Sequence, residues 1–308
     1  MSRDFLMVSD FTSEELARCL RLAGRCKRTP TLGHSACAGK TLAMVFQKPS
    51  LRTRVSFEVA ARQLGGSSLY LGPHEVQLGT REPIKDVART LSRYVDGLVI
   101  RSFRHQDVEE FAQYASVPVI NGLSDLHHPC QALADLLTVQ ERFGRLRGVS
   151  LSYLGDGNNV LHSLAQAASA LGVHLRVATP SRYRPQPAIW DQAVRQAKRH
   201  GATLSWGNDP KAAVRKADVI YTDVWASMGD EHEHGIRRKA FRGFQLTGDL
   251  LRLARPRCIV MHCLPAHRGE EIATEVLDGP RSVVFEQAEN RLHAQKALLM
   301  LLFGGAKR

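Results

Sequence analysis

Short apolar runs alternate with helical stretches along almost the whole chain of 308 residues. Apolar runs typical of buried strands lie at 41–46, 97–100, 117–120, 150–154, 173–178, 219–222, 258–261 and 282–285. Stretches with helical spacing of their apolar residues lie at 54–64, 84–94, 131–143, 160–171, 187–200 and 290–303. Because a repeated strand–helix–strand order builds parallel sheets with helices on both faces, we predict an α/β fold.

The length of the chain suits two domains of about 150 residues each. A polar, glycine-containing segment from Phe143 to Gly148 marks the boundary between them. We predict a first domain at 1–146, a second at 147–286, and a C-terminal helix within 287–308 that packs back on the first domain. Each domain is expected to be a parallel sheet flanked by helices, with the active site in the cleft between the two.

The start of the first helix is also visible in the sequence. Thr12 stands where an N-cap residue is expected, and Glu15 follows three residues later, which together form a capping box. Leu16, Leu20 and Ala23 continue at helical spacing. We therefore expect a helix that begins directly after Thr12.

Composition narrows the class of protein. Apolar residues make up 44% of the chain, but no apolar run approaches the roughly 20 residues of a membrane span. The net charge is +12, yet the basic residues are scattered and form no block typical of nucleic-acid binding. An anionic small substrate explains this charge better. The six cysteines show no CxxC pair, and no leader segment is apparent, so we expect a reduced, cytoplasmic protein.

Polar clusters follow the predicted strands at six places. They begin at Gln47, Arg101, Asn121, Gly155, Asp223 and His262. In open parallel sheets, ligands bind at the carboxyl ends of the strands. Six clusters at that edge, drawn from both halves, predict one binding cleft.

The first of these clusters has the chemistry of a phosphate site. It runs from Lys48 to Arg54 and contains Ser50, Arg52 and Thr53 at an expected helix start. Backbone N–H groups at a helix N-terminus favour an anion, and arginine adds charged donors. A capped, solvated helix start is the alternative, but positive charge there opposes the helix dipole. We therefore favour phosphate binding by Arg52 and Arg54.

The second cluster runs from Asp125 to Gln131. Pro129 suits the first position of a helix, which puts His128 at the mouth of the site. A structural role for a single histidine stays open. A zinc site of His127, His128 and Cys130 fails because no fourth ligand has suitable spacing.

The segment from Gly155 to Val160 follows a strand and opens a helix, as a dinucleotide-binding loop does. It has only two of the three expected glycines, and the next strand ends without the acidic residue that would hold a ribose. We therefore reject a nicotinamide cofactor. Asn158 and Asn159 instead hold the polar end of a ligand, or cap the helix.

The clusters at 223–229 and 262–265 complete the set. Asp223 puts a carboxylate at a strand end, which suggests a ligand with a cationic group, although a helix cap is the alternative. His262 and Cys263 suggest a nucleophile pair, but neighbours on an extended strand point to opposite faces. We therefore do not expect a His–Cys dyad.

Together these motifs resemble the aspartate/ornithine carbamoyltransferase family over essentially the whole chain. Ser50-Leu51-Arg52-Thr53-Arg54 is similar to its Ser-Thr-Arg-Thr-Arg motif, with Leu51 where threonine is usual, a position that backbone N–H groups can serve. His128-Pro129-Cys130-Gln131 resembles the His-Pro-x-Gln motif. Asp223-x-x-x-Ser227-Met228-Gly229 and His262-Cys263-Leu264-Pro265 resemble the ornithine branch.

The resemblance implies two substrate sites and no cofactor or metal. The residues it implies for carbamoyl phosphate are Ser50, Leu51, Arg52, Thr53, Gln77, Arg101, His128, Pro129, Cys130, Gln131, Cys263, Leu264 and Arg291. Those it implies for L-ornithine are Asn159, Asp223, Ser227 and Met228. The residues it implies for catalysis are Arg101, His128, Gln131, Cys263 and Asp223. It also implies a homotrimer, or a multiple of trimers, in which Gln77 reaches a neighbouring subunit's site.

The implied reaction gives L-citrulline and phosphate, in arginine metabolism, by attack of the neutral δ-amine on the carbamoyl carbon. Three alternatives stay open at this stage: a carbamoyltransferase for another amine such as putrescine, a nucleic-acid-binding protein, and a non-catalytic partner subunit. Neither a nucleic acid nor a membrane is expected as a partner.

Overall fold

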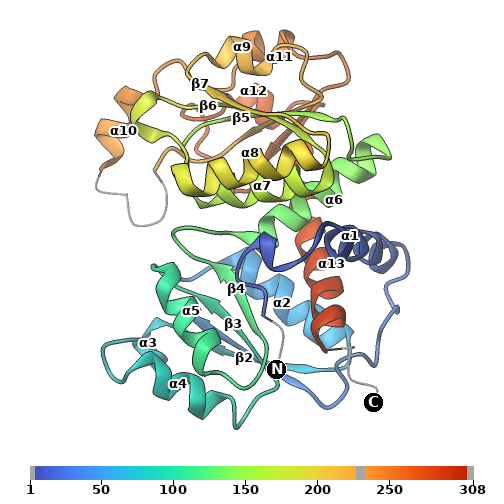
Figure 1. Ribbon diagram of the computed structural model, residues 1–308, viewed down its shortest axis with the longest axis vertical. Helices are drawn as coiled ribbons and strands as arrows, with labels where there is room; N and C mark the ends of the chain where they lie inside the picture. The colour runs from blue at the N-terminus through green and yellow to red at the C-terminus, as the bar shows by residue number, and fades with distance from the viewer. Residues whose placement is uncertain (1–3, 227–232, 304–308) are drawn as a thin grey trace. The chain divides into compact units, whose positions relative to one another are not determined.

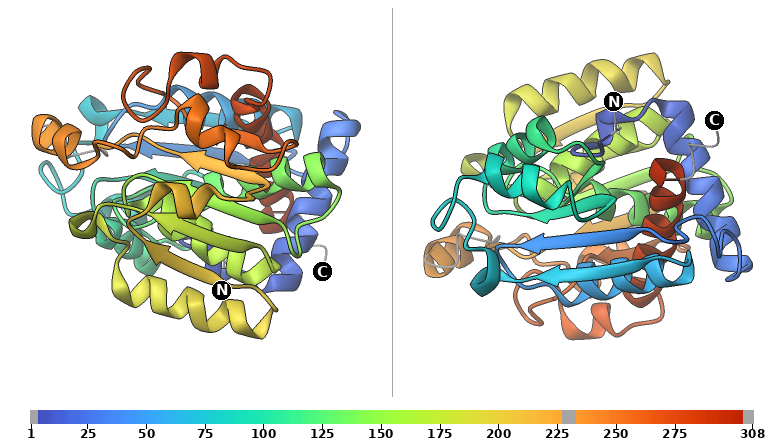
Figure 2. Two further views of the ribbon diagram at one scale, coloured as in Figure 1. Left: turned by 90° about the horizontal axis from the view of Figure 1, so that it is seen from above. Right: turned by 90° about the horizontal axis from the view of Figure 1, so that it is seen from below.

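The computed structural model describes residues 4–226 and 233–303. The chain divides into two compact units, one made of residues 1–137 with 289–308 and the other of residues 138–288. The divisions fall inside two helices, α6 (Pro129–Phe143) and α13 (Val284–Phe303). Figures 1 and 2 show the course of the chain.

The first unit is built on a four-stranded parallel sheet of order β2-β1-β3-β4. Its strands are β1 (Thr41–Phe46), β2 (Ser67–Leu71), β3 (Gly97–Arg101) and β4 (Val119–Leu123). Its helices are η1 (Val8–Asp10), α1 (Ser13–Arg28), α2 (Leu51–Gln63), α3 (Pro73–Val76), α4 (Ile84–Leu91) and α5 (His105–Tyr114).

Both faces of this sheet are covered. Ala43, Val45 and Ile100 pack against Val87 and Phe111 of α4 and α5, which Figure 1 shows on one side of the strands. On the other side, Leu42 of β1 lines a small cavity with side chains of α2 and α13. Burial on both faces explains why β1 reads as a continuous apolar run instead of an alternating one.

The second unit is built on a five-stranded parallel sheet of order β7-β6-β5-β8-β9. Its strands are β5 (Ser150–Leu154), β6 (His174–Ala178), β7 (Leu204–Gly207), β8 (Val219–Thr222) and β9 (Ile259–His262). Its helices are α7 (Asn159–Leu171), η2 (Ser181–Tyr183), α8 (Pro187–Arg199), α9 (Pro210–Val214), α10 (His234–Ala240), α11 (Gly248–Arg252) and α12 (Thr274–Leu277).

Helices again cover both faces. Figure 1 shows α7 and α8 together on one side of this sheet and α9 and α11 on the other. The core on the second side joins Leu154, Ile220 and Val260 of three strands to Phe241 and Leu250. The predicted fold class, parallel sheets flanked by helices, is confirmed.

The predicted elements agree with the structure at most places. Helix α1 has the predicted capping box: Thr12 Oγ1 accepts from Glu15 N at 3.3 Å, and Glu15 Oε2 accepts from Thr12 N at 2.8 Å. The strand predicted at 117–120 lies two residues later, because Asn121 and Gly122 continue it as buried residues. The polar residue Asn121, at which the predicted polar cluster begins, therefore lies within the strand and does not end it.

One predicted strand is wrong and two strands were missed. The run 282–285 makes only a single bridge, between Ser282 and Val260, and the backbone turns into α13 at Val284. The missed strands β2 and β7 are edge strands with partly exposed residues, so neither shows an apolar run.

Over the described ranges, no helix combines the length and apolarity that crossing a bilayer requires.

Candidate functional site

In each sheet, the chain first adds strands on one side of the starting strand and then on the other, which creates a switch point in the strand order. The chemically distinctive residues follow the strands at this point. In the first sheet, α2 leaves β1 toward β2 while β3 lies on the other side of β1. In the second sheet, α7 leaves β5 toward β6 while β8 lies on the other side of β5. Such switch points open a crevice at the carboxyl ends of the strands.

In the first unit, the switch point carries the start of α2. Ser50 is the N-cap of this helix, and its Oγ accepts a hydrogen bond from Thr53 N at 3.4 Å. The helix begins at Leu51, as predicted, and its side chain is exposed while Thr53 is buried. The first turn carries no acidic residue, so no carboxylate there competes with an anion for the N–H groups.

Three guanidinium groups converge on this point. Arg101 ends β3, and its pKa is lowered to about 10 by burial, by Arg291 and by Arg52. Burial and the same three arginines lower the pKa of His128 well below its ordinary value. At neutral pH the site therefore combines cationic arginines with a neutral imidazole, an arrangement suited to an anion.

A buried hydrogen-bond chain holds the arginine from α13. Arg291 donates from Nη2 to Thr53 Oγ1 at 3.2 Å and from Nη1 to Gln131 Oε1 at 2.8 Å. Gln131 in turn donates from Nε2 to Asp135 Oδ1 at 2.8 Å. Asp135 is fully buried and was not singled out in the sequence, although its position four residues after Gln131 on α6 could have indicated it.

Pro129 is the first residue of α6, as predicted, and the neighbouring Cys130 is fully buried. The thiol of Cys130 donates to Asn121 O at 3.5 Å, and burial raises its pKa to about 12. Cys130 therefore packs beneath the site and is no nucleophile there.

Two further predicted residues lie on exposed segments. Arg54 forms an ion pair with Glu58 at 2.9 Å and stacks over the ring of Tyr70 at 4.0 Å. These contacts hold Arg54 at the surface, and the phosphate binding that the sequence suggests for Arg54 and Arg52 stays a prediction. Gln77 is exposed at the end of α3, with φ of 47°.

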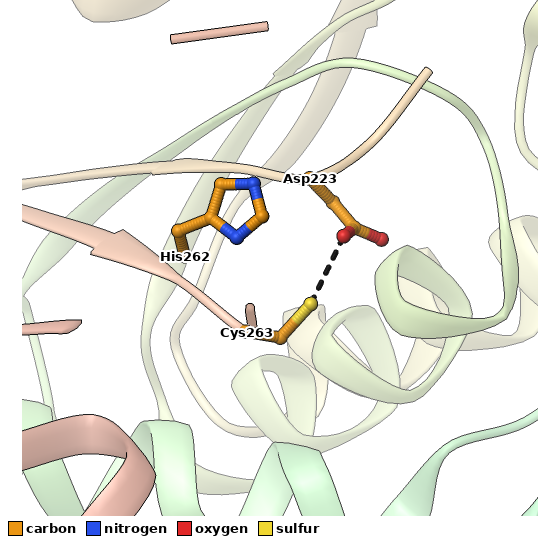
Figure 3. Close-up of side chains that lie close together, drawn as sticks. All are labelled: Asp223, His262 and Cys263. Carbon is orange, nitrogen blue, oxygen red and sulfur yellow. Dashed lines mark hydrogen bonds between the residues drawn. The ribbon is translucent and has the colours of Figure 1, made fainter. Parts of the chain in front are cut away.

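In the second unit, the switch point carries a carboxylate held by two donors. Asn158 donates from Nδ2 to Asp223 Oδ2 at 2.8 Å, and the Cys263 thiol donates to Asp223 Oδ1 at 2.9 Å (Figure 3). Asp223 is almost fully buried and is the N-cap of no helix in the described ranges. Its carboxyl group is therefore available for a cationic ligand group.

The two asparagines differ in role. Asn158 is the N-cap of α7, since its Oδ1 accepts from Val160 N and Leu161 N. Asn159 is the first residue of that helix and is buried. The predicted ligands Ser227 and Met228 lie outside the described residues.

The stated reason for rejecting a His262–Cys263 pair is wrong. Strand β9 ends at His262, so strand alternation does not govern Cys263, and both side chains come close to Asp223 (Figure 3). Candidate ligand atoms of these three residues lie within 4.8 Å of one another, a spacing that would admit a metal ion. His262 is instead engaged by Leu264 N at 2.9 Å and by Glu271 Oε1 at 3.1 Å. Leu264 has a left-handed backbone, with φ of 57°.

Close packing explains why the loop before α7 contains a glycine at position 157. A Cβ on Gly157 would lie 2.3 Å from the backbone carbon of Arg184 and 2.4 Å from Pro185 N. Gly157 thus permits close approach of the loop that follows β6. Asp156, in the same loop, pairs with buried Arg237 at 2.8 Å.

Family models match nearly all of the chain. The carbamoyl-P binding domain of aspartate/ornithine carbamoyltransferase matches residues 3–141, and the Asp/Orn binding domain of the same family matches residues 147–302.

Full-length relatives and solved structures agree with these matches. An ornithine carbamoyltransferase of Thermococcus kodakarensis is 55% identical over 99% of this chain and 98% of its own length. The solved ornithine carbamoyltransferase of Pyrococcus furiosus has a TM-score of 0.96 at 54% identity and covers 99% of this chain and 98% of its own. The anabolic enzyme of Campylobacter jejuni has a TM-score of 0.93 at 39% identity, covering 97% of this chain and 98% of its own.

Proposed function

The chain belongs to the aspartate/ornithine carbamoyltransferase family, and we propose from that premise how its residues act. It is an enzyme of the ornithine branch, which transfers the carbamoyl group of carbamoyl phosphate to the δ-amine of L-ornithine and gives L-citrulline and phosphate. Two observations carry our assignment of roles: the first unit has a cationic site, and the second unit has the buried Asp223.

Carbamoyl phosphate binds at the start of α2. Its phosphate is held by Arg52, by the hydroxyls of Ser50 and Thr53 and by the N–H groups of the first turn. Gln77 of a neighbouring subunit is proposed to complete this contact. The three converging arginines support the proposal, because a dianion relieves their mutual repulsion.

The carbamoyl oxygen lies against Arg101, His128 and Gln131. Negative charge develops on this oxygen as the amine attacks, and fixed donors lower the barrier. Because its pKa is well below the ordinary value, His128 is neutral at pH 7 and acts as a hydrogen-bond donor, not as a cation. Loss of one such donor typically costs on the order of 3 kcal/mol of transition-state stabilisation.

Ornithine binds to the second unit, at the carboxyl ends of its strands. Asn159 and Asp223 hold its α-carboxylate and α-amino ends, together with Ser227 and Met228. Cys263 and the Leu264 carbonyl border the carbamoyl group. The δ-amine attacks in its neutral form, and the departing phosphate takes its proton.

The choice of ornithine as acceptor is tested by a citrulline assay with carbamoyl phosphate and a panel of acceptors: ornithine, putrescine, N-acetylornithine and aspartate. Ornithine is expected to give the highest kcat/KM. A higher value for putrescine would favour the diamine alternative, since putrescine has no α-carboxylate. A salt-dependent gel shift with nucleic acid would favour the binding-protein alternative.

Finer attributes are proposed with this function. A homotrimer, or a multiple of trimers, follows from the shared-site role of Gln77. A reducing, cytoplasmic location is consistent with six free thiols. An anabolic enzyme of Pyrococcus furiosus is 54% identical, which supports a role in arginine synthesis.

A further inference from the structure

A second cluster of metal-binding side chains lies outside the proposed substrate site. His267, Glu270 and Glu271 offer ligand atoms that all lie within 4.8 Å of one another. We propose that this 267–271 cluster binds one divalent transition-metal ion of the zinc type. The proposal is independent of the transfer reaction.

A tight turn brings the three side chains together. Glu270 N donates to His267 O at 3.0 Å, and Gly269 N donates to Ile272 O at 2.9 Å. Gly269 has φ of 85°, a conformation that side-chain-bearing residues rarely adopt. The turn therefore fixes the spacing between His267 and the two adjacent glutamates.

The buried carboxyl group of Glu271 is the feature that indicates a bound cation. Its Oε1 accepts from His267 N at 2.5 Å and lies 3.1 Å from His262 Nε2. His262 Nδ1 accepts from Leu264 N, so the imidazole is the donor in the hydrogen bond between His262 Nε2 and Glu271 Oε1. Oε1 of Glu271 therefore accepts two hydrogen bonds.

The other oxygen of Glu271 faces the cluster. Glu271 is fully buried, and its Oε2 has no hydrogen-bond partner. This oxygen lies 3.9 Å from His267 Nδ1. Burying a carboxyl oxygen without a donor costs free energy, and a cation beside it would remove that cost.

The proposed fourth ligand is His234 of α10, which contacts Glu270. His234 Nε2 lies 3.1 Å from Glu270 Oε2. Two imidazoles and two carboxylates form a nitrogen–oxygen set that suits Zn²⁺, whereas Ca²⁺ and Mg²⁺ prefer oxygen ligands alone. Tetrahedral ligands about 2.0–2.1 Å from zinc lie roughly 3.3 Å apart. The side chains of His267 and Glu270 are 50% and 22% exposed, so they have room to rotate inward.

The test must separate this cluster from the one formed by Asp223, His262 and Cys263. The background is therefore Cys263→Ala, which removes the thiol of that other cluster. Zinc binding is measured by titration calorimetry and by metal analysis after dialysis. We expect one zinc ion per chain in this background.

Removing two ligands of the proposed site should weaken this binding. His267→Ala with Glu270→Gln, made in the Cys263→Ala background, should weaken zinc affinity by at least about tenfold. His34→Ala in the same background is the control, since His34 is an exposed histidine on another segment. Far-UV circular dichroism and Tm confirm folding, and the isosteric Glu270→Gln alone carries the test if the double change unfolds the protein.

Cobalt(II) gives a readout of the ligand type. A nitrogen–oxygen set in the Cys263→Ala background should show ligand-field bands without a thiolate charge-transfer band. Absence of zinc binding in this background, or binding that the His267 and Glu270 changes leave intact, would overturn the proposal.

Discussion

Arg291→Met is the substitution whose consequences the structure defines best. It removes the buried donor to Thr53 Oγ1 and Gln131 Oε1, at 3.2 and 2.8 Å. Hydrogen bonds to charged groups contribute roughly 1.5–3 kcal/mol each, so their loss removes about 3–6 kcal/mol from the folded state.

Relief of repulsion between the arginines opposes this loss. The pKa of Arg101 falls from 12.5 to about 10, with burial as the larger cause and Arg291 second. Arg291 therefore accounts for at most about half of that fall, or roughly 1.7 kcal/mol at 1.36 kcal/mol per pKa unit. The hydrogen bonds dominate, and the ligand-free variant should be less stable by about 1–4 kcal/mol.

The substitution should destabilise the ligand-bound state more than the ligand-free state. Without ligand, Arg291 repels the neighbouring arginines, but with carbamoyl phosphate bound it also attracts the phosphate. Thermal unfolding with and without inorganic phosphate, and kcat/KM for carbamoyl phosphate, measure the two effects. We expect a Tm lower by several degrees, a smaller Tm gain from phosphate, and a kcat/KM at least about tenfold lower.

Arg142→Met is the matched control, since Arg142 is a surface arginine paired with Glu286. It should leave both the Tm gain from phosphate and kcat/KM within about twofold of the wild type. If Arg291→Met behaves like this control, the reasoning about the buried arginine is wrong.

Four more outcomes follow from the proposed roles. Asp223→Asn keeps the shape but removes the charge, so kcat/KM for ornithine should fall by about 10–150-fold while KM for carbamoyl phosphate changes little; an unchanged ornithine value would remove the residue from the site. Arg52→Ala should weaken carbamoyl phosphate turnover by at least about tenfold, but Arg54→Ala, which breaks a surface ion pair, should cost no more than about threefold; equal losses would contradict this separation. The kcat/KM for ornithine should rise from about pH 6 to 9, because only the neutral amine attacks and its reference pKa is near 10.4; a flat profile would exclude this. Mixed assemblies of Gln77→Ala and Arg101→Ala chains, confirmed by native mass spectrometry, should be more active than either parent, and no gain would refute a shared site.

Much of the local structure could be predicted because its causes are local. Thr12 and Glu15 cap each other within one turn, and Pro129 starts a helix by its own ring geometry. The apolar runs of the central strands mark burial on both faces, which needs no knowledge of the partner strand. Edge strands β2 and β7 escaped prediction because their residues are partly exposed and form no apolar run, whereas the edge strands β4 and β9 are buried throughout.

The chemistry of the site was also predictable residue by residue, since phosphate calls for arginines and hydroxyls at a helix start. The contacts among those residues were not. Arg291 meets Thr53 and Gln131 across more than 150 positions of sequence. Likewise, the sequence suggests the same role for Arg52 and Arg54, and only the structure shows that Arg54 contacts Glu58 and Tyr70.

The sequence by itself determined the parallel α/β class, the starts of α1, α2 and α6, and the residue types at the strand ends. Only the tertiary structure decided that Asn158 and Cys263 both donate to Asp223, and that Glu271 is buried beside His262. The physical reason is that propensity and capping act within a few residues, whereas burial, pKa shifts and hydrogen-bond partners depend on segments that the folded chain brings together from distant positions.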